Sequence, residues 1–282
     1  MSRFGRLRRH FHSRQQLTAA HNVKGFTKLS LEQLEDRVLP SISPASLLSG
    51  LYRDLLQRDP DPTGQAHWTQ ALQGGNSAAD VALQIVQSSE YHGKFVDQEY
   101  SALLGRPADA FGRSTFSSWL DAGATPEQVE TKILASPEYL TRAGGTTSSY
   151  LDALYHDALG RKMDASGAAT FGQALDAGVP RDVIASTVLT SVEGDQRQVQ
   201  ELYQQFLHRT AEPGGLTTWV TALQHNIRTD QVTAEILGSD EYQLLQQSSG
   251  RQPGDSITLQ ALSGATVSLA RAHHEHPLRA SQ

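Results

Sequence analysis

The sequence predicts an all-α fold of four tandem three-helix repeats, arranged as two pairs between disordered N- and C-terminal tails. Three observations carry this prediction. One ordered set of residues recurs four times between residues 46 and 249, apolar residues inside each copy follow helical spacing, and a Gly/Ser/Thr-rich segment interrupts the recurrence halfway. A chain of 282 residues can bury such a core, and the absence of cysteine excludes disulfides, thiolate metal sites and cysteine nucleophiles.

The first helix of each copy carries its apolar residues on one face. In the first copy Leu48, Leu51, Tyr52, Leu55 and Leu56 follow the spacing i, i+3, i+4, i+7 and i+8 of a buried helix face. The tyrosine recurs in every copy and is expected to lie in the core. The four tyrosines are Tyr52, Tyr100, Tyr155 and Tyr203.

A motif of arginine, acid, glycine and aromatic residue follows each first helix. The acid stands three positions after the arginine, the glycine three after the acid and the aromatic four after the glycine, and the arginines are 48, 55 and 48 residues apart. The copies are Arg58, Asp61, Gly64 and Trp68; Arg106, Asp109, Gly112 and Phe116; Arg161, Asp164, Gly167 and Phe171; and Arg209, Glu212, Gly215 and Trp219.

We interpret this motif as structural. An arginine paired with the acid would tie the end of the first helix to the next loop, and glycine would permit either a positive φ or a close approach between helices. The aromatic residue has a leucine four positions later on the predicted second helix, so we expect both in the core. A ligand or cation site in every loop is the alternative, but structural roles recur along repeats more regularly than binding sites do.

A third apolar helix with recognisable start signals is expected in each copy. In the second copy Thr125 is the predicted N-cap, Pro126 the first helical residue and Gln128 the capping-box partner. A serine, with a glutamate two positions later, closes each copy, and we interpret these pairs as helix caps as well. They are Ser88 and Glu90, Ser136 and Glu138, Ser191 and Glu193, and Ser239 and Glu241. We expect the third helix to run on into the first helix of the next copy.

The spacing between copies predicts a hinge in the middle of the chain. The connection between the second and third copies is seven residues longer than the others and includes the segment 143–149, which is rich in Gly, Ser and Thr. The predicted organisation is a basic, mostly disordered leader over residues 1–45, repeats 1 and 2 over 46–142, a hinge over 143–149, repeats 3 and 4 over 150–249, and a polar tail over 250–282.

Charge is distributed unevenly along the chain. The first 45 residues hold eight Lys or Arg and three Asp or Glu, whereas residues 46–249 hold 13 basic and 25 acidic residues. An acidic body repels nucleic acid and anionic membranes, so neither is an expected partner. No apolar run is long enough to predict a transmembrane segment or a standard signal peptide.

The recurring pattern resembles a known family. A Leu-Tyr pair, Arg58, Asp61, Gly64 and Trp68, followed by an apolar helix and Ser-x-Glu-Tyr, resemble the bacterial domain-of-unknown-function 4214 family, which looks distantly like the phycobilisome linker domain. The resemblance covers roughly residues 46–246 in four copies. Copy 1 fits best, and copy 3 departs most, with Phe171 for tryptophan and Gly194 for tyrosine. The resemblance implies an all-helical, secreted or surface-associated module without enzymatic activity, and it carries over no catalytic residue.

A second resemblance concerns the segment before the repeats. Residues 31–37, Leu-Glu-Gln-Leu-Glu-Asp-Arg, are similar to an L-E-x-L-E-D-R motif near the start of large surface proteins of some bacteria. The segment follows a basic stretch and precedes the repeats, as that motif does. The resemblance implies a role in export or sorting, and therefore a secreted or cell-surface location.

We expect a non-enzymatic structural or protein-interaction module of an exported or cell-surface bacterial protein, whose partners are other envelope or extracellular proteins. A glycan- or calcium-binding module is one alternative, based on the aromatic residue that recurs in each copy and on the acid-rich loop from Asp59 to Gly64. Against calcium, Gln70 stands where an EF-hand loop needs glutamate. An enzyme with an unrecognised site between the repeat pairs is the second alternative. The chain lacks a P-loop, a nucleophile elbow and an H-E-x-x-H motif, so no catalytic residue, cofactor or metal ligand is predicted.

Overall fold

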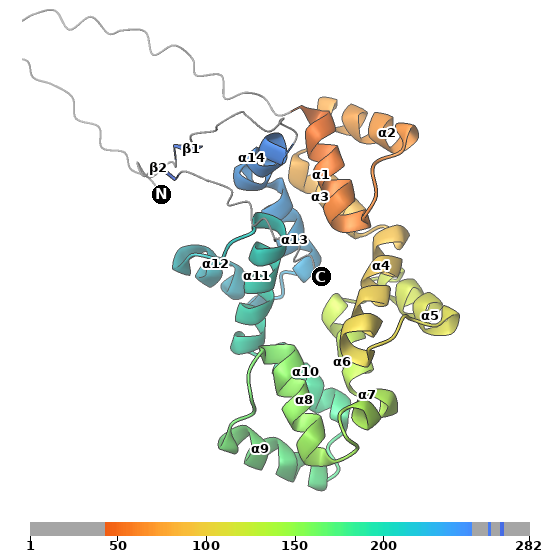
Figure 1. Ribbon diagram of the computed structural model, residues 1–282, viewed down its shortest axis with the longest axis vertical. Helices are drawn as coiled ribbons and strands as arrows, with labels where there is room; N and C mark the ends of the chain where they lie inside the picture. The colour runs from red at the N-terminus through yellow and green to blue at the C-terminus, as the bar shows by residue number, and fades with distance from the viewer. Residues whose placement is uncertain (1–42, 250–258, 261–265, 268–282) are drawn as a thin grey trace, which may run out of the picture. The chain divides into compact units, whose positions relative to one another are not determined.

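The computed structural model describes residues 43–249, 259–260 and 266–267, and residues 43–249 are all-helical, as predicted (Figure 1). Beyond them, the two-residue strands β1 (Leu259–Gln260) and β2 (Thr266–Val267) pair antiparallel. The predicted leader reaches residue 45, but α1 already begins at Pro44, so the last residues of that segment belong to the first helix. The predicted disorder of the rest of the leader and of the remaining tail concerns residues outside the described ones, as does the motif at residues 31–37.

Each of the four copies contributes three main helices. The first copy consists of α1 (Pro44–Leu56), α2 (Pro62–Gln73) and α3 (Ala78–Val86). The second consists of α4 (Ser89–Glu99), continued by the π-helical turn η1 (Tyr100–Leu104), then α5 (Ala110–Asp121) and α6 (Pro126–Leu134). The short helix α7 (Pro137–Arg142) precedes the third copy, α8 (Thr147–Leu159), α9 (Ala165–Asp176) and α10 (Arg181–Leu189). The fourth consists of α11 (Val192–Leu207), α12 (Pro213–Gln224) and α13 (Thr229–Gly238), and α14 (Asp240–Ser249) follows it.

The local start signals act as the sequence predicts. Thr125 caps α6, and its hydroxyl accepts a hydrogen bond from the backbone N–H of Gln128, whose side chain accepts from the N–H of Thr125. Each of the four recurring serines accepts a hydrogen bond from the backbone N–H three residues later, which is N-cap geometry. The four bonds run to Ser88 from Tyr91, to Ser136 from Tyr139, to Ser191 from Gly194 and to Ser239 from Tyr242.

These serine caps correct one expectation, namely that the third helix continues into the next copy. Helix α3 ends at Val86, and the extended backbone of Ser88 (φ −77°, ψ 148°) starts a new helix, α4. That new helix, not the third one, continues into the tyrosine of the next copy. The break arises because the serine hydroxyl takes a backbone N–H that an uninterrupted helix would use internally.

The helices enclose two separate hydrophobic cores. The first core combines helices α1 to α3 with α12 to α14 and part of α11, and its buried residues include Leu51, Ile85, Phe206, Ile236 and Tyr242. The second core combines helices α4 to α10 with η1, and its buried residues include Val96, Ile133, Tyr139, Leu154 and Val188. Copies 1 and 4 therefore share one core, and copies 2 and 3 share the other.

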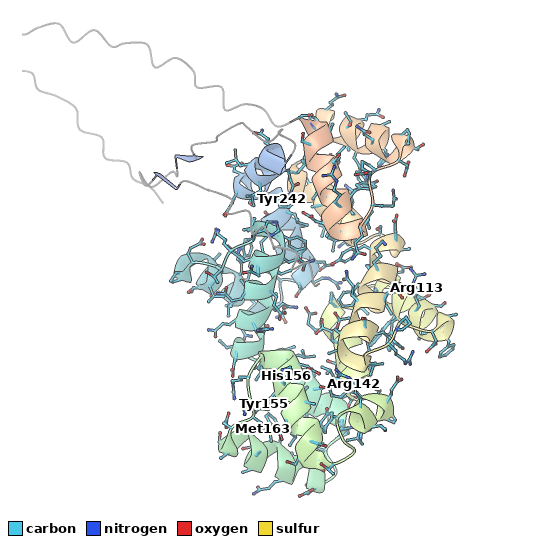
Figure 2. The ribbon with its side chains drawn as sticks, viewed as in Figure 1. Arg113, Arg142, Tyr155, His156, Met163 and Tyr242 are labelled. Carbon is cyan, nitrogen blue, oxygen red and sulfur yellow. The ribbon has the colours of Figure 1, made fainter. Side chains whose placement is uncertain are left out.

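This arrangement corrects the expected pairing of copy 1 with 2 and copy 3 with 4. Helix α3 packs along α13, and α6 packs along α10 (Figure 1). Helix α14 packs against α1, where Tyr242 enters the first core (Figure 2). Helices α3 and α13 are the third helices of copies 1 and 4, which are not neighbours in the sequence. They nevertheless bury their apolar faces against each other, and this contact removes apolar surface from water.

The segment 143–149 is likewise not a boundary between pairs. It joins α7 to α8, and both helices belong to the second core, where the rings of Tyr139 and Tyr150 meet edge-to-face with centroids 6.0 Å apart. Gly144 and Gly145 take positive φ values of 106° and 76°, which ends the helix. The extra residues therefore make a turn within one core.

Within residues 43–249 no helix combines the length and the apolar character that crossing a membrane requires.

Candidate functional site

The recurring polar residues of each copy meet in one place, which we call the arginine cluster. It contains the tyrosine of the first helix, the four motif residues and the glutamate that follows the capping serine. The clusters are Tyr52, Arg58, Asp61, Gly64, Trp68 and Glu90; Tyr100, Arg106, Asp109, Gly112, Phe116 and Glu138; Tyr155, Arg161, Asp164, Gly167, Phe171 and Glu193; and Tyr203, Arg209, Glu212, Gly215, Trp219 and Glu241.

The guanidinium group makes the same contacts in every copy. In the first cluster Arg58 donates from Nε and Nη2 to the two carboxylate oxygens of Glu90, at 2.7 and 2.8 Å. Its Nη1 donates to the carbonyl oxygen of Asp59 at 3.1 Å and to Asp61 at 3.4 Å. The ring of Tyr52 lies under the guanidinium, with 5.0 Å from Cζ to the ring centroid. The other three copies repeat all of these contacts.

The acid of the cluster has a second task, because it begins the second helix. Asp61 caps α2 by accepting the backbone N–H of Gly64 at 2.9 Å. This hydrogen bond lowers the pKa of Asp61, and the hydrogen bond from Arg58 lowers the pKa of Glu90. Both carboxylates therefore stay ionised in the folded protein. In the fourth copy Glu212 stands at the start of α12, where it makes no such cap bond but pairs with Arg209.

The glycine provides space for the tyrosine hydroxyl. A Cβ atom on Gly64 would lie 2.5 Å from the hydroxyl oxygen of Tyr52, and one on Gly215 would lie 2.6 Å from that of Tyr203. None of the four motif glycines has a positive φ. Of the two roles that the sequence left open for this glycine, the close approach applies.

The aromatic residues of the clusters contact the same tyrosines. Trp68 donates from Nε1 to the hydroxyl of Tyr52 at 2.9 Å, and Trp219 donates to that of Tyr203 at 3.2 Å. Phe116 instead meets the ring of Tyr100, with centroids 6.2 Å apart. All four aromatic residues are half-buried and pack against a core, whereas the four tyrosines are buried.

The glutamate is the member of the cluster that was not expected from the sequence, because we assigned the recurring serine–glutamate pairs to helix capping alone. A signal was present. In all four copies the glutamate follows the arginine by 32 residues, including copies that flank the longer connection. A constant spacing between opposite charges indicates a pair that the fold brings together.

The loop from Asp59 to Gly64 is not arranged around a cation. The carboxylate of Asp59 accepts from Nε of Arg53 at 3.1 Å, while Asp61 is engaged with Arg58 and the N–H of Gly64. Over the part of the chain that the structure describes, no group of three or more His, Asp or Glu side chains is placed to hold a metal ion.

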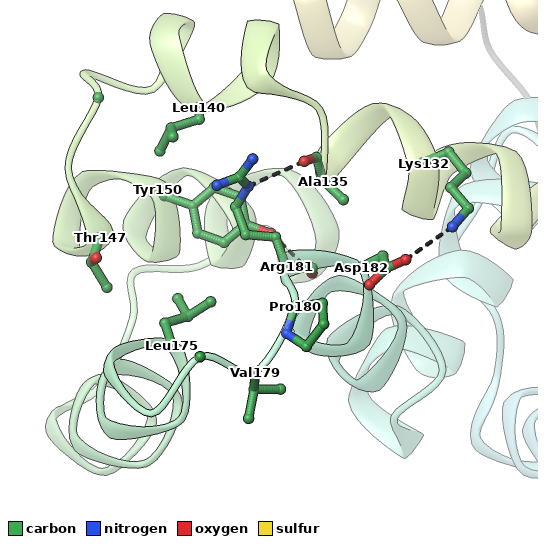
Figure 3. Close-up of a pocket in the computed structure, with 12 residues that line it drawn as sticks. Lys132, Ala135, Leu140, Thr147, Tyr150, Leu175, Val179, Pro180, Arg181 and Asp182 are labelled. Atoms are coloured by element: carbon green, nitrogen blue, oxygen red, sulfur yellow. Dashed lines mark hydrogen bonds and ion pairs between the residues drawn. The ribbon is translucent and has the colours of Figure 1, made fainter.

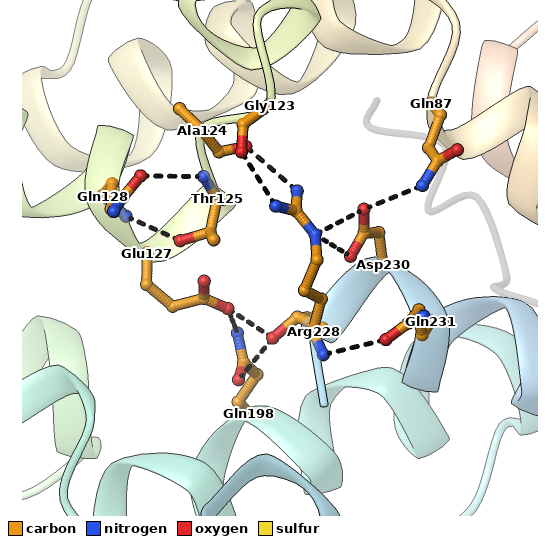
Figure 4. A network of polar contacts seen from close by, with 11 residues as sticks. Gln87, Gly123, Ala124, Thr125, Glu127, Gln128, Gln198, Arg228, Asp230 and Gln231 are labelled. Carbon is orange, nitrogen blue, oxygen red and sulfur yellow. Dashed lines mark hydrogen bonds and ion pairs between the residues drawn. The ribbon is translucent and has the colours of Figure 1, made fainter. Parts of the chain in front are cut away.

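A polar junction links the two cores (Figure 4). Arg228, before α13, donates to the carbonyl oxygens of Gly123 and Ala124 at 2.9 and 3.0 Å and pairs with Asp230 at 3.0 Å. Asp230 also accepts from Gln87, after α3, at 3.3 Å. The contacts thus connect the end of α3, the turn between α5 and α6, and the start of α13.

A second set of contacts extends the junction to α11. Glu127 on α6 accepts from Nε2 of Gln198 at 3.1 Å and from the hydroxyl of Thr229 (Figure 4). Each of these residues belongs to a different helix, α6, α11 or α13. The two cores are therefore held together by hydrogen bonds in addition to the chain connections.

Three glutamates line a cavity of about 160 Å³ beside this junction, namely Glu99, Glu130 and Glu201. Burial, and to a smaller extent the charge of Glu201, raise the pKa of Glu99 to about 7. Burial and the charges of Glu99, Glu127 and Glu201 raise the pKa of Glu130 as well. The carboxyl of Glu99 takes up and releases a proton near neutral pH, but the cavity is smaller than the roughly 300–1,000 Å³ of ordinary ligand pockets.

Comparison with known proteins finds one match. No curated protein and no solved structure matches the chain. The family described as Domain of unknown function (DUF4214) matches residues 41–95, 130–198 and 193–245. These stretches contain the arginine clusters of copies 1, 3 and 4, while Arg106 and Phe116 of copy 2 lie outside them even though copy 2 builds the same cluster. Because the matched stretches cover more than half of the sequence, the chain belongs to the domain-of-unknown-function 4214 family.

Proposed function

We propose that the chain is a non-enzymatic structural or protein-interaction module of an exported or cell-surface bacterial protein. The observation that supports this proposal is that the polar groups of the arginine clusters bond mostly to one another. Four of the five N–H donors of Arg58 are used by Glu90, Asp59 and Asp61, and Tyr52 covers one face of the guanidinium.

This internal bonding has a direct functional consequence. A catalytic or ligand-binding group needs a free donor, acceptor or nucleophile directed at a substrate. In the arginine clusters the recurring polar atoms are directed at one another, so their fourfold recurrence serves to build each copy. Binding would then use exposed helix surfaces, and the excess of acidic residues in the repeats favours protein partners in the envelope or outside the cell over nucleic acid.

The calcium and glycan alternatives receive less support from the same contacts. The carboxylates of Asp59 and Asp61 are occupied by arginines, and Trp68 and Trp219 direct their Nε1 donors to buried tyrosines. We expect calorimetry of the full chain with calcium, and with soluble cell-wall glycans, to show no heat of binding. Saturable heat with either would favour that alternative instead.

Cell fractionation tests the proposed setting. Bacterial cells that produce the full chain are separated into cytosolic, envelope and extracellular fractions, and the mature N-terminus is determined by mass spectrometry in each. We expect the protein in the envelope or extracellular fraction. Recovery of the intact chain from the cytosol alone would contradict the proposal.

A further inference from the structure

The second core contains an open pocket of about 620 Å³ (Figure 3). Apolar side chains of Leu140, Leu175 and Val179 form part of its wall. Gly145 and Thr147 also line it, and both come from the longer connection between copies 2 and 3. The pocket therefore involves the one segment in which the chain departs from its regular repeat.

Arg181 at the start of α10 is a charged residue of this pocket that has no ion-pair partner among the described residues. Over residues 43–249 it is the one arginine without a carboxylate within 4.0 Å; the other nine are all ion-paired. Its Nε donates to the carbonyl oxygen of Ala135 at 3.1 Å. Its two terminal nitrogens make no hydrogen bond to the described residues.

The nearest acidic residue in the sequence does not neutralise this charge. Asp182 pairs with Nζ of Lys132 at 2.9 Å, and both line the pocket (Figure 3). The three charges of Lys132, Arg181 and Asp182 leave one positive charge in excess. Arg181 is half-buried, so this charge is only partly screened by water.

The first core has a position equivalent to that of Arg181, and it is not occupied by an arginine. The motifs of copies 1 and 3 are 103 residues apart, as are those of copies 2 and 4, so Ala78 corresponds to Arg181 and Gly238 to Ala135. There the helices approach so closely that a Cβ on Gly238 would lie 2.6 Å from the Cβ of Ala79. Packing of two copies therefore does not require an arginine at this position.

We propose that the pocket binds a carboxylate carried on an apolar group, as presented by the last residue of a peptide or by a free apolar carboxylic acid. The free side of the guanidinium matches a carboxylate with two parallel N–H donors, and one uncompensated positive charge matches one negative charge. The walls of Leu140, Leu175 and Val179 contact the apolar part. This inference goes beyond the proposed module function and does not depend on it.

Calorimetry with the full chain tests the proposal. The probes are an N-acetylated tripeptide ending in leucine with a free carboxylate, the same tripeptide as its C-terminal amide, and hexanoate. We expect the free-acid peptide to bind and the amide to bind at least tenfold more weakly. Hexanoate binding as tightly as the peptide acid identifies a free acid as sufficient, and weaker binding of hexanoate identifies the peptide end as the better ligand; both support the pocket.

Variants locate the binding. Arg181→Gln should weaken binding of the free-acid peptide at least tenfold, and Arg181→Lys should weaken it several-fold, because lysine keeps the charge but loses the paired donors. Arg53→Gln, on α1 in the other core, is the matched control and should leave binding unchanged. No binding by either acid, equal binding of acid and amide, or full binding by Arg181→Gln would each overturn the proposal. The comparison of acid with amide uses the unaltered chain and so stands even if a variant fails to fold.

Discussion

The hydroxyl of Tyr242 on α14 donates a 2.7 Å hydrogen bond to the carboxylate of Asp54 on α1, 188 residues earlier in the chain. The second core contains the same pair, in which Tyr139 on α7 donates to Asp157 on α8 at 2.8 Å across only 18 residues. Each tyrosine directly follows a cluster glutamate, and each aspartate stands four residues before a cluster arginine. Helix α14 therefore completes copy 1 as α7 completes copy 3.

This relationship predicts that Tyr242 couples the last described helix to the first. Tyr242→Phe should lower the free energy of unfolding by about 1–2 kcal/mol, because a buried bond to a carboxylate is lost and Asp54 keeps only a 3.4 Å contact with Gln246. Urea unfolding of the single variants and of Tyr242→Phe/Asp54→Asn measures the coupling. Strictly additive effects would show that the bond contributes nothing. Tyr139→Phe is the matched variant in the second core.

The adjacent glycines of α12 predict opposite effects of one substitution. Gly215→Ala should destabilise the protein by about 1–3 kcal/mol, because the new Cβ lies 2.6 Å from the hydroxyl of Tyr203. Gly214→Ala meets nothing within 4 Å and should be neutral or stabilise by up to about 1 kcal/mol, since alanine favours the helix. Thermal unfolding compares the two. Adding Tyr203→Phe should recover part of the loss in Gly215→Ala, and a loss of equal size in both alanine variants would contradict the role given to the hydroxyl.

The contacts of the arginine clusters predict that a positive charge at the arginine position is not sufficient for full stability. Arg209→Lys keeps the charge but cannot donate to both oxygens of Glu241 while lying over Tyr203, so we expect a loss of about 0.5–1.5 kcal/mol, limited by the partial exposure of the pair. Arg113→Lys is the control, because Arg113 makes one ion pair, with Asp97. Chemical unfolding of both variants decides the matter, and equal effects would argue against the bidentate contact as the cause.

The acidic cavity predicts that stability falls as the pH rises. The pKa of Glu99 is about 7 in the folded protein and 4.5 as its ordinary value, so between these values the folded state holds a proton that the unfolded state has released. Stability should therefore decrease from about pH 4.5 to about pH 7, on the order of 3 kcal/mol. Glu99→Gln should flatten this dependence and stabilise the protein at pH 8. Glu235→Gln, at an exposed position on α13, is the control, and an unchanged pH profile in Glu99→Gln would refute the assignment.

Recurrence and local signals are enough to predict the helices of this chain. N-caps such as Thr125 and Ser136, and the apolar spacing around Tyr52, act over a few residues and form the same contacts wherever the chain lies. The pair of Arg58 with Asp61 spans only three residues and could be anticipated for the same reason. The pair of Arg58 with Glu90 was also indicated, by the constant spacing of 32 residues. Recognising this spacing as a contact requires knowing that the chain turns back between the two residues.

Only the folded chain decides which copies share a core. The apolar faces of α3, α6, α10 and α13 are similar in composition, so the sequence allows several pairings, and the longer connection at 143–149 favoured the wrong one. The choice is made by contacts between distant residues, such as Ala79 with Gly238 and Asp54 with Tyr242, whose shapes and hydrogen bonds fit in one arrangement. The free terminal nitrogens of Arg181 depend on the same arrangement, because an arginine lacks an ion-pair partner only when the surrounding helices place every carboxylate elsewhere.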